Sequence, residues 1–249
     1  MPPNLTKGTI MKIKVFLCAL LVGMFAMADE LLTETVKTYD WMRKSAYSVN
    51  MASPELAGLV GLAIQMKMQQ MGIQIPIKIR NFMLKSDVAN GISVKVGLDI
   101  PDETQRKQME TQLNQMMTSM GFSKAMGDCS IGAIGKLIEY IEKNADSFTQ
   151  TAESTEAVAQ YVCDSPAMVL LGGKSVNKIL VNVNKQYKII PAVRFDFAEG
   201  AALIQFSHDM VQGRACPLKM MMRHTIKQQP GGMMIPPSVT ATMSDYKFQ

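Results

Sequence analysis

Apolar and polar residues alternate along several stretches of this chain, and a period of two restricts those stretches to strands that bury one face. The clearest stretch is residues 73–80, where isoleucine occupies every second position: Ile73, Ile75, Ile77 and Ile79. The alternation resumes with shifted parity at Phe82 and Leu84, which predicts a β-bulge. Asn90-Gly91 predicts a tight turn, and residues 92–100 alternate again. We therefore expect a hairpin of two long, half-buried strands.

The second half of the chain repeats this behaviour. After Pro166, alternating stretches separated by short turns cover residues 179–184, 187–197, 202–206, 218–226 and 239–248. Consecutive strands with short connections favour antiparallel pairing. The sequence therefore predicts a meander of about six strands that runs to the end of the chain.

Two helices are expected before the hairpin. Residues 30–43 carry apolar residues at helical spacing: Leu32, Val36, Tyr39 and Met42. A short strand over residues 47–51 follows. Ser53 and Pro54 then provide the N-cap and first position of a helix that runs to Met71. Since that helix has no polar side chain from Leu56 to Ile64, it either is buried on most sides or faces an apolar partner.

Residues 102–163 are expected to form a helical block with three apolar stripes. The stripes are Met109, Leu113, Met116, Met117 and Met120; Ile131, Ile134, Leu137, Ile138 and Ile141; and Ala157, Val158 and Tyr161. We therefore predict an α+β fold, in which a curved antiparallel sheet forms an unclosed half-barrel covered by the helical block. Residues 29–249 should form a single mature domain that contains this block as a helical insertion.

The amino-terminal segment has the pattern of a secretory signal. Lys12 and Lys14 follow Met11, which is a candidate start residue, and an apolar run precedes Ala26-Met27-Ala28. A membrane anchor is the alternative, but the run is shorter than the roughly 20 residues of a bilayer span. Cleavage after Ala28 would leave a soluble protein in the periplasm or outside the cell.

Removing residues 1–28 also changes the charge. The segment contains Lys7, Lys12 and Lys14 and no acids, so the formal charge falls from +5 to +2. No cluster of Lys and Arg along the remaining sequence supports nucleic-acid binding.

Three cysteines follow this segment: Cys129, Cys163 and Cys216. If two antiparallel helices connect Cys129 to Cys163, both sulfur atoms lie at the same end of the pair. We therefore predict a Cys129–Cys163 disulfide, as an exported protein can form. Three buried thiols are the alternative.

The sequence contains no recognisable catalytic or metal-binding motif. Its two histidines, His208 and His224, fall in predicted strands and lack nearby ligand spacing. Leu171-Gly172-Gly173-Lys174 is similar to part of a phosphate-binding loop, but a strand follows it, so a hairpin turn explains it better. We expect no enzymatic activity, no cofactor and no bound metal.

Methionine is unusually frequent, with 23 residues against 9 phenylalanines and 1 tryptophan. It falls in three groups: Met66, Met68 and Met71; Met116, Met117 and Met120; Met220, Met221 and Met222. Thioethers suit Cu(I), which makes a copper-handling protein one alternative. Core packing explains the helical groups better, because their spacing follows the apolar stripes. Residues 228–237 carry three apolar side chains between glycines and prolines, which fits either a lid or an ordinary hairpin loop.

The layout resembles the periplasmic outer-membrane lipoprotein carriers and their lipoprotein-sorting relatives. The residues that carry the resemblance are the opening strand 47–51, Tyr187 to Pro191, the hairpin from Phe195 to Phe206, Leu218 to Met220, and Ser244 to Phe248. The resemblance implies an unclosed antiparallel barrel whose apolar concave face is covered by helices and holds acyl chains. By analogy only, Arg80 would gate that cavity.

We therefore expect an exported carrier that binds the acyl chain of a lipid or lipoprotein and touches membranes transiently. The expected ligand-binding residues are Leu56, Leu59, Val60, Ile64, Met68, Ile75, Ile77, Ile79, Met220 and Met222. A structural or interaction protein of the cell envelope is the main alternative. The sequence does not specify the oligomeric state.

Overall fold

The structure is a computed structural model of the chain. It describes residues 30–70, 77–88, 91–119, 123, 126–127, 130–170, 173–227 and 236–249. The predicted signal segment and the loop 228–235 lie outside the described residues.

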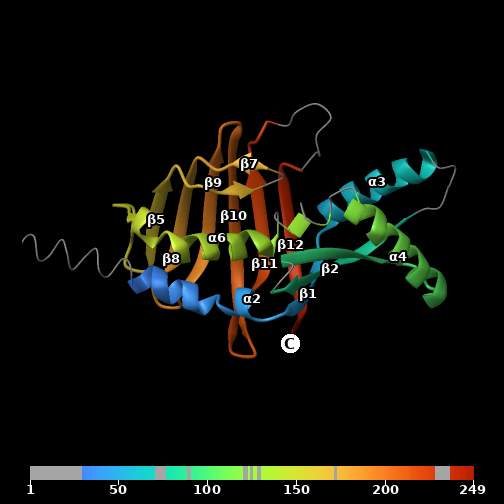
Figure 1. The fold of residues 1–249 in the computed structure, drawn as a ribbon, viewed down its shortest axis with the longest axis horizontal. Helices are drawn as coiled ribbons and strands as arrows, with labels where there is room; N and C mark the ends of the chain where they lie inside the picture. Colours follow the sequence, from blue (N-terminus) through green and yellow to red (C-terminus); the bar gives the residue numbers. More distant parts are fainter. Residues whose placement is uncertain are drawn as a thin grey trace, which may run out of the picture.

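A single antiparallel sheet of ten strands dominates the molecule (Figure 1). Its strands, in chain order, are β1 (Tyr47–Ala52), β2 (Ile79–Asp87), β3 (Gly91–Leu98), β4 (Thr149–Gln150), β5 (Val158–Asp164), β8 (Lys178–Asn184), β9 (Ile189–Phe197), β10 (Gly200–Val211), β11 (Arg214–His224) and β12 (Ser238–Phe248). The spatial order is β3-β2-β1-β12-β11-β10-β9-β8-β5-β4. Because β3 and β4 are edges that do not pair with each other, the sheet is unclosed. The predicted α+β fold class is confirmed.

The last strand connects the two parts of the sheet. Strands β8 to β12 follow one another as an antiparallel meander, as the sequence predicts, although it has five strands and not six. β12 then pairs with β1, so the carboxyl-terminal strand bridges the meander and the amino-terminal strands. A separate short antiparallel hairpin pairs β6 (Val169–Leu170) with β7 (Lys174–Ser175), and Gly173 before β7 has a φ of 106°. This pairing agrees with the hairpin interpretation, although residues 171–172 lie outside the described residues.

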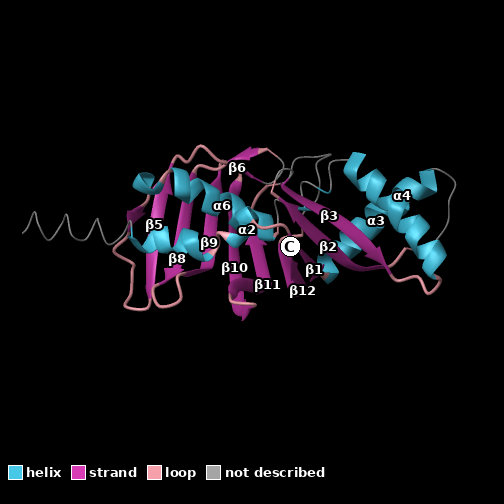
Figure 2. Ribbon diagram, turned by 60° about the horizontal axis from the view of Figure 1, so that its bottom comes forward, coloured by secondary structure: helices cyan, strands magenta, loops and turns pink. Residues whose placement is uncertain are grey.

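Helices cover one face of the sheet (Figures 1 and 2). Residues 30–38, α2 (Trp41–Lys44) and α6 (Ile131–Lys143) cross the strands of the meander, whereas α3 (Pro54–Gln70) and α4 (Glu103–Ser119) lie at the other end, near β1 to β3. Buried apolar residues from Leu32 to Tyr246 form one continuous cluster between helices and sheet. Both helices predicted before the hairpin are present, although a turn at residues 39–40 divides the first into residues 30–38 and α2.

The β2–β3 hairpin has the predicted bulge. Its register shifts between Ile79 and Asn81, and Phe82 and Leu84 are fully buried. Gly91 has a φ of 74°, the left-handed conformation that a tight turn requires and glycine adopts without strain. The expected start of the strand was too early: Ile77 precedes β2, and residues 73–76 lie outside the described residues.

The predicted helical block ends earlier than expected. α6 ends at Lys143, a short 3-10 turn η1 (Ala145–Ser147) follows, and residues 158–164 form strand β5. The helical interpretation of Ala157, Val158 and Tyr161 was therefore wrong. In β5 every second residue is buried: Ala159, Tyr161 and Cys163. These residues lie on the face of β5 that points toward the helices, and pairing with β8 fixes that orientation.

This correction removes the geometric reason for the predicted disulfide. Cys163 lies in a strand and not at the end of a helical pair, and the structure holds its thiol free and buried. Its sulfur lies 4.0 Å from the hydroxyl oxygen of Tyr140 in α6. Cys129 lies outside the described residues.

Candidate ligand-binding site

The inner face of α3 lies over the end of the sheet where a ligand was expected. Its buried residues recur at every fourth position: Leu56, Val60, Ile64 and Met68. This stripe packs toward β2 and β12. The helix begins after Ser53, whose Oγ accepts a 3.4 Å hydrogen bond from the backbone N–H of Leu56, as the predicted N-cap requires.

The expected ligand-binding residues divide into three groups. Leu56, Val60, Ile64, Met68, Ile79, Met220 and Met222 belong to one buried cluster, with Ile77 packed against its margin. In β11, Met220 and Met222 are paired with Ala241 and Val239 of β12, the strand that α3 contacts. Leu59 is half-buried, and Ile75 lies outside the described residues. The structure thus brings most of this set together, while its role in binding a ligand remains a prediction.

The outer face of α3 exposes two large apolar side chains among glutamines and a glutamate. Leu62 is 58% exposed and Met66 is 56% exposed. The sequence left two interpretations of this helix, burial on most sides or contact with an apolar partner, and each fits one side of it. The inner side is buried, and the outer side presents apolar surface to solvent.

The methionine groups do not converge where the structure describes them. Met66 is exposed whereas Met68 is buried, so their side chains lie on different sides of α3. Met221 has the opposite strand parity from the buried Met220 and Met222. Met71 and Met120 lie outside the described residues. Within the described chain, no group of three histidine, cysteine or acidic side chains could hold a metal ion either.

Polar side chains of α4 and its neighbourhood satisfy the free edge of β3. The backbone N–H of Val96 donates to Asn114 Oδ1 at 2.7 Å, and that of Leu98 donates to Glu110 Oε1 at 2.8 Å. Ser123 Oγ accepts from the Val94 N–H at 2.9 Å and donates to the Val94 carbonyl at 3.0 Å. α4 itself buries only Leu113 and Met117 among its residues. Polar contacts with the sheet edge are therefore a large part of what holds this helix.

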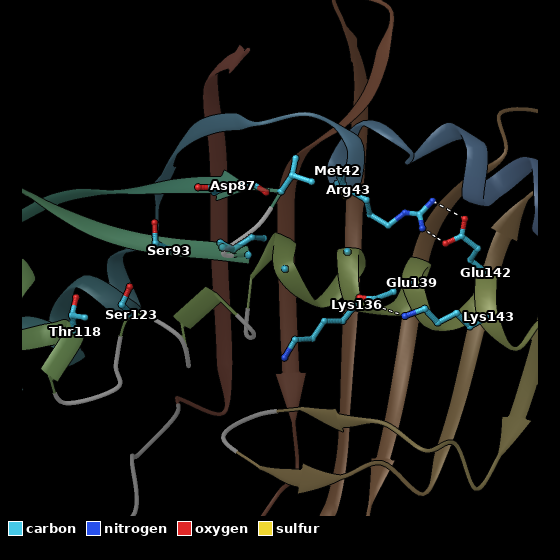
Figure 3. Close-up of a pocket in the computed structure, with 16 residues that line it drawn as sticks. Met42, Arg43, Asp87, Ser93, Thr118, Ser123, Lys136, Glu139, Glu142 and Lys143 are labelled. Carbon is cyan, nitrogen blue, oxygen red and sulfur yellow. Dashed lines mark hydrogen bonds and ion pairs between the residues drawn. The ribbon is translucent and has the colours of Figure 1, made fainter.

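A pocket of about 740 Å³ lies between the tip of the β2–β3 hairpin and the outer side of α6 (Figure 3). Met42 of α2 and Ile92 of β3 contribute apolar surface to it, and Gly132 and Gly135 of α6 line it. A Cβ atom at Gly135 would meet no other atom within 4 Å, whereas one at Gly132 would collide with the carbonyl oxygen of Gly127. Gly132 is thus required for close packing, and Gly135 keeps part of the pocket open.

Charged residues form the rim of this pocket (Figure 3). Arg43 of α2 makes an ion pair with Glu142 of α6, and its Nη2 lies 2.5 Å from Asp40 Oδ1. Hydrogen bonding to Arg43 lowers the pKa of Glu142. Along the same side of α6, Lys143 Nζ lies 2.6 Å from Glu139. A pocket whose lining combines apolar, polar and charged side chains suits a molecule that has an apolar tail and a polar head.

Sequence reasoning did not find this pocket. Its lining combines residues from α2, the hairpin and α6, which only the tertiary structure brings together. One signal was available, since Gly132 and Gly135 lie inside an otherwise strongly amphipathic helix and interior glycines disfavour helix formation.

A buried polar contact joins the first helical segment to the meander. The hydroxyl of Tyr39 lies 2.8 Å from His208 Nε2 and accepts a 2.9 Å hydrogen bond from the Ile190 N–H. Burial raises the pKa of Tyr39, so its hydroxyl keeps its proton and can donate it to Nε2. Burial also lowers the pKa of His208 to about 4. The histidine is therefore neutral near pH 7, and its contact with Tyr39 joins two elements of the fold.

The described thiols are poor nucleophiles. Burial raises the pKa of Cys216 to about 12 and also raises the pKa of Cys163. Since the thiolate is the reactive form, neither group is activated near neutral pH. Among the described residues, no helix is both long and apolar enough to cross a membrane.

No family model and no curated protein matches this chain. Three solved structures are similar to it. A DUF1329 family protein from Desulfovibrio piger shares 10% identity with a TM-score of 0.41, covering 90% of this chain and 92% of its own. A LolA superfamily protein from Nitrosomonas europaea shares 12% identity with a TM-score of 0.35, covering 86% and 92%. A putative outer membrane lipoprotein-sorting protein domain from Vibrio parahaemolyticus shares 10% identity with a TM-score of 0.38, covering 88% and 93%. The names of the last two belong to the family that the sequence resembles.

Proposed function

We propose that this protein is an exported carrier that holds the acyl chain of a lipid or lipoprotein in the pocket between the β2–β3 hairpin and the outer side of α6. The observation that supports this most is the pocket of about 740 Å³ itself, with its lining of apolar, polar and charged side chains. Its volume lies within the range of roughly 300 to 1,000 Å³ that small-molecule sites occupy. The polar head would face the rim near Arg43 and Glu142, and the chain would extend over the apolar part of the lining.

Apolar binding without directional contacts has a sufficient driving force. Burial of an acyl chain contributes about 0.8 kcal/mol per methylene. Methionine side chains adapt their shape to neighbouring groups, and Met42 in the pocket and Met220 and Met222 in the adjoining core are of this kind. Such a surface would accept chains of different length and saturation.

The substitution Gly135→Leu tests this proposal because Gly135 lines the pocket and a Cβ atom there meets no other atom within 4 Å, so the larger side chain would take up pocket volume. We expect uptake of a fluorescent fatty acid to fall at least tenfold, while the helix gains about 0.5 to 1 kcal/mol from the replacement of glycine. Gly58→Leu in α3 is the matched control, since its Cβ also meets no atom within 4 Å and it does not line the pocket. Equal uptake by the two variants would reject this binding site.

Export is part of the same proposal. Cleavage after Ala28 predicts that amino-terminal sequencing of protein recovered from outside the cytoplasm begins at Asp29. A sequence that begins at Met1 or Met11 would contradict export by this signal.

A second candidate function is an envelope interaction protein. Leu62 and Met66 on the outer face of α3 favour it, because exposed apolar side chains on one helix face often mark a protein contact. Loss of a partner on Leu62→Asp, with unchanged uptake of fatty acid, would support this candidate over the carrier.

A further inference from the structure

The solvent face of strands β3, β2, β1, β12 and β11 carries a group of cations that is not visible in the linear sequence. Five exposed side chains form this basic face: Lys95 in β3, Lys85 in β2, Lys247 in β12, and Lys219 and Arg223 in β11. They lie opposite the face that the helices cover, because each alternates with buried residues of the core.

The register of the sheet places these residues on one surface. Ser48 in β1 is paired with Lys85 on one side and with Lys247 on the other, so the two lysines are separated by two strand spacings, or about 10 Å. Lys95 is paired with Met83, two positions from Lys85. Lys219 and Arg223 are paired with Thr242 and Ser238 of β12. Directly paired residues share a face. A bulge in β12 at Asp245, whose φ is 55°, shifts the parity so that Lys247 is exposed on the same face as Thr242. The five cations therefore form one surface.

This surface has a strong excess of positive charge. None of its five cations has an ion pair with another described residue. The acids within these five strands are Asp87 at the hairpin tip and Asp245. Asp245 accepts a 2.9 Å hydrogen bond from Asn50, which lowers its pKa, and Lys247 lowers it further.

The same face of the neighbouring strands differs. Arg194 in β9 lies 2.7 Å from Asp196, and Lys178 in β8 lies 3.3 Å from Asp164. Cations on that part of the sheet are therefore neutralised by adjacent acids. The unbalanced charge is confined to the end formed by β1 to β3, β12 and β11.

We propose that the basic face docks this protein on the phosphate head groups of an anionic lipid bilayer. Five strands give a surface about 20 Å wide, and lysine stems extend their charges away from it. Small polar residues separate the cations. Among the described residues of these five strands, Met83 is the one large apolar side chain that is exposed, at 39%. Protein interfaces usually have an apolar centre, whereas attraction to anionic lipid needs only positive charge near the surface.

Vesicle sedimentation of the full-length mature protein tests the proposal. Wild type should sediment with vesicles that contain phosphatidylglycerol and remain in solution with vesicles of phosphatidylcholine alone. Each cation contributes about fivefold to such binding, so the variant K85Q/K95Q/K219Q/K247Q should lose measurable sedimentation. Raising the salt concentration from about 0.05 M to about 0.5 M should release the wild type, because screening shortens the range of the attraction.

A variant with the same net charge is the matched control. K37Q/K44Q/K107Q/K185Q removes four lysines that lie outside both the basic face and the pocket, three of them exposed and Lys185 half-buried, and it should sediment as the wild type does. Equal loss in both variants, or equal binding to both kinds of vesicle, would overturn the proposal. Wild-type binding to soluble polyglutamate that equals binding to the anionic vesicles would also overturn it, in favour of an acidic protein partner. The acyl-chain proposal does not affect this test, because both vesicle types contain acyl chains.

Discussion

The two ends of the sheet are covered by helices in different ways. Over the meander, α6 buries Ile131, Ile134, Leu137, Ile138 and Ile141 completely, and strands β5, β8 and β9 bury matching residues beneath the helices. Over the other end, α3 buries one narrow stripe and exposes Leu62, and α4 is held by polar contacts to β3 together with Leu113 and Met117. The first arrangement is a closed core. The second is a cover with much less apolar contact, and it is the part that could move to admit a ligand.

The largest expected effect comes from introducing a charge beneath the helices at each end of the sheet. Leu137→Asp places an unpaired charge in the closed core, which costs several kcal/mol and should unfold the protein. Leu113→Asp in α4 should release that helix while β8 to β10 stay folded. Hydrogen exchange measured by mass spectrometry distinguishes the outcomes. If Leu113→Asp removes protection from the meander as well, the two ends form one cooperative unit and the comparison fails.

The second largest effect is the expected difference between substitutions on the inner and outer faces of α3. Ile64 is buried, so Ile64→Asp should detach α3 or destabilise the fold by several kcal/mol, whereas Leu62→Asp should change stability by less than about 0.5 kcal/mol. Thermal unfolding and fatty-acid uptake should be measured on both variants. A ligand held beneath α3, as the sequence predicts, would make Ile64→Asp lose uptake while the meander remains protected. A ligand held in the pocket beside Gly135 predicts unchanged uptake, because α3 does not line that pocket. Loss of the whole fold would make α3 a purely structural helix.

The Tyr39–His208 contact makes the meander end sensitive to pH. The folded-state pKa of His208 is lowered to about 4, so between pH 6.5 and 4 the unfolded chain binds a proton that the folded chain does not. The contribution of His208 to the free energy of unfolding should therefore be fully present above pH 6.5, and the free energy should fall by up to about 3 kcal/mol as the pH drops to 4. Urea titrations of wild type and His208→Gln across this window test the effect. If the free energy of unfolding depends on pH equally in both proteins, groups other than His208 cause the pH dependence.

The smallest effect concerns the edge of β3. Glu110→Ala leaves the backbone N–H of Leu98 without its acceptor and should cost about 1 to 3 kcal/mol locally. Unsatisfied edge strands also pair with other chains, so this variant should self-associate. Glu110→Gln keeps the acceptor oxygen and serves as the control. In sedimentation velocity, the alanine variant should form a larger species and the glutamine variant should not. If both variants are monomeric, the side-chain contact does not protect the edge of the sheet.

Local patterns predicted much of this fold. The period of two found the hairpin, and the parity change between Ile79 and Phe82 located its bulge, because each is a property of neighbouring residues. The helical stripe of α6 was equally clear. Residues 157–163 failed because a short apolar run fits either period, and only pairing with β8 decides between them.

The surfaces that concern function were harder to predict. Four of the five strands of the basic face contribute one or two cations each and β1 contributes none, so neither a charge run nor a net charge could show that Lys85 and Lys247 flank the same serine. The contact of Glu110 with the β3 backbone likewise depends on how α4 folds back onto the sheet. The described members of the expected ligand set, such as Ile64 and Met220, lie in one buried cluster because burial follows hydropathy, and their role in ligand binding stays a prediction. The pocket beside Gly135 could not be found in this way.

Native mass spectrometry of the mature protein, purified without detergent from its own compartment, tests the carrier proposal most directly. The proposal predicts a fraction of molecules with the added mass of a lipid or an acyl chain, and a reduced fraction in Gly135→Leu compared with Gly58→Leu. Protein that has only its own mass, together with no uptake of fluorescent fatty acid or phospholipid by the wild type, would contradict it.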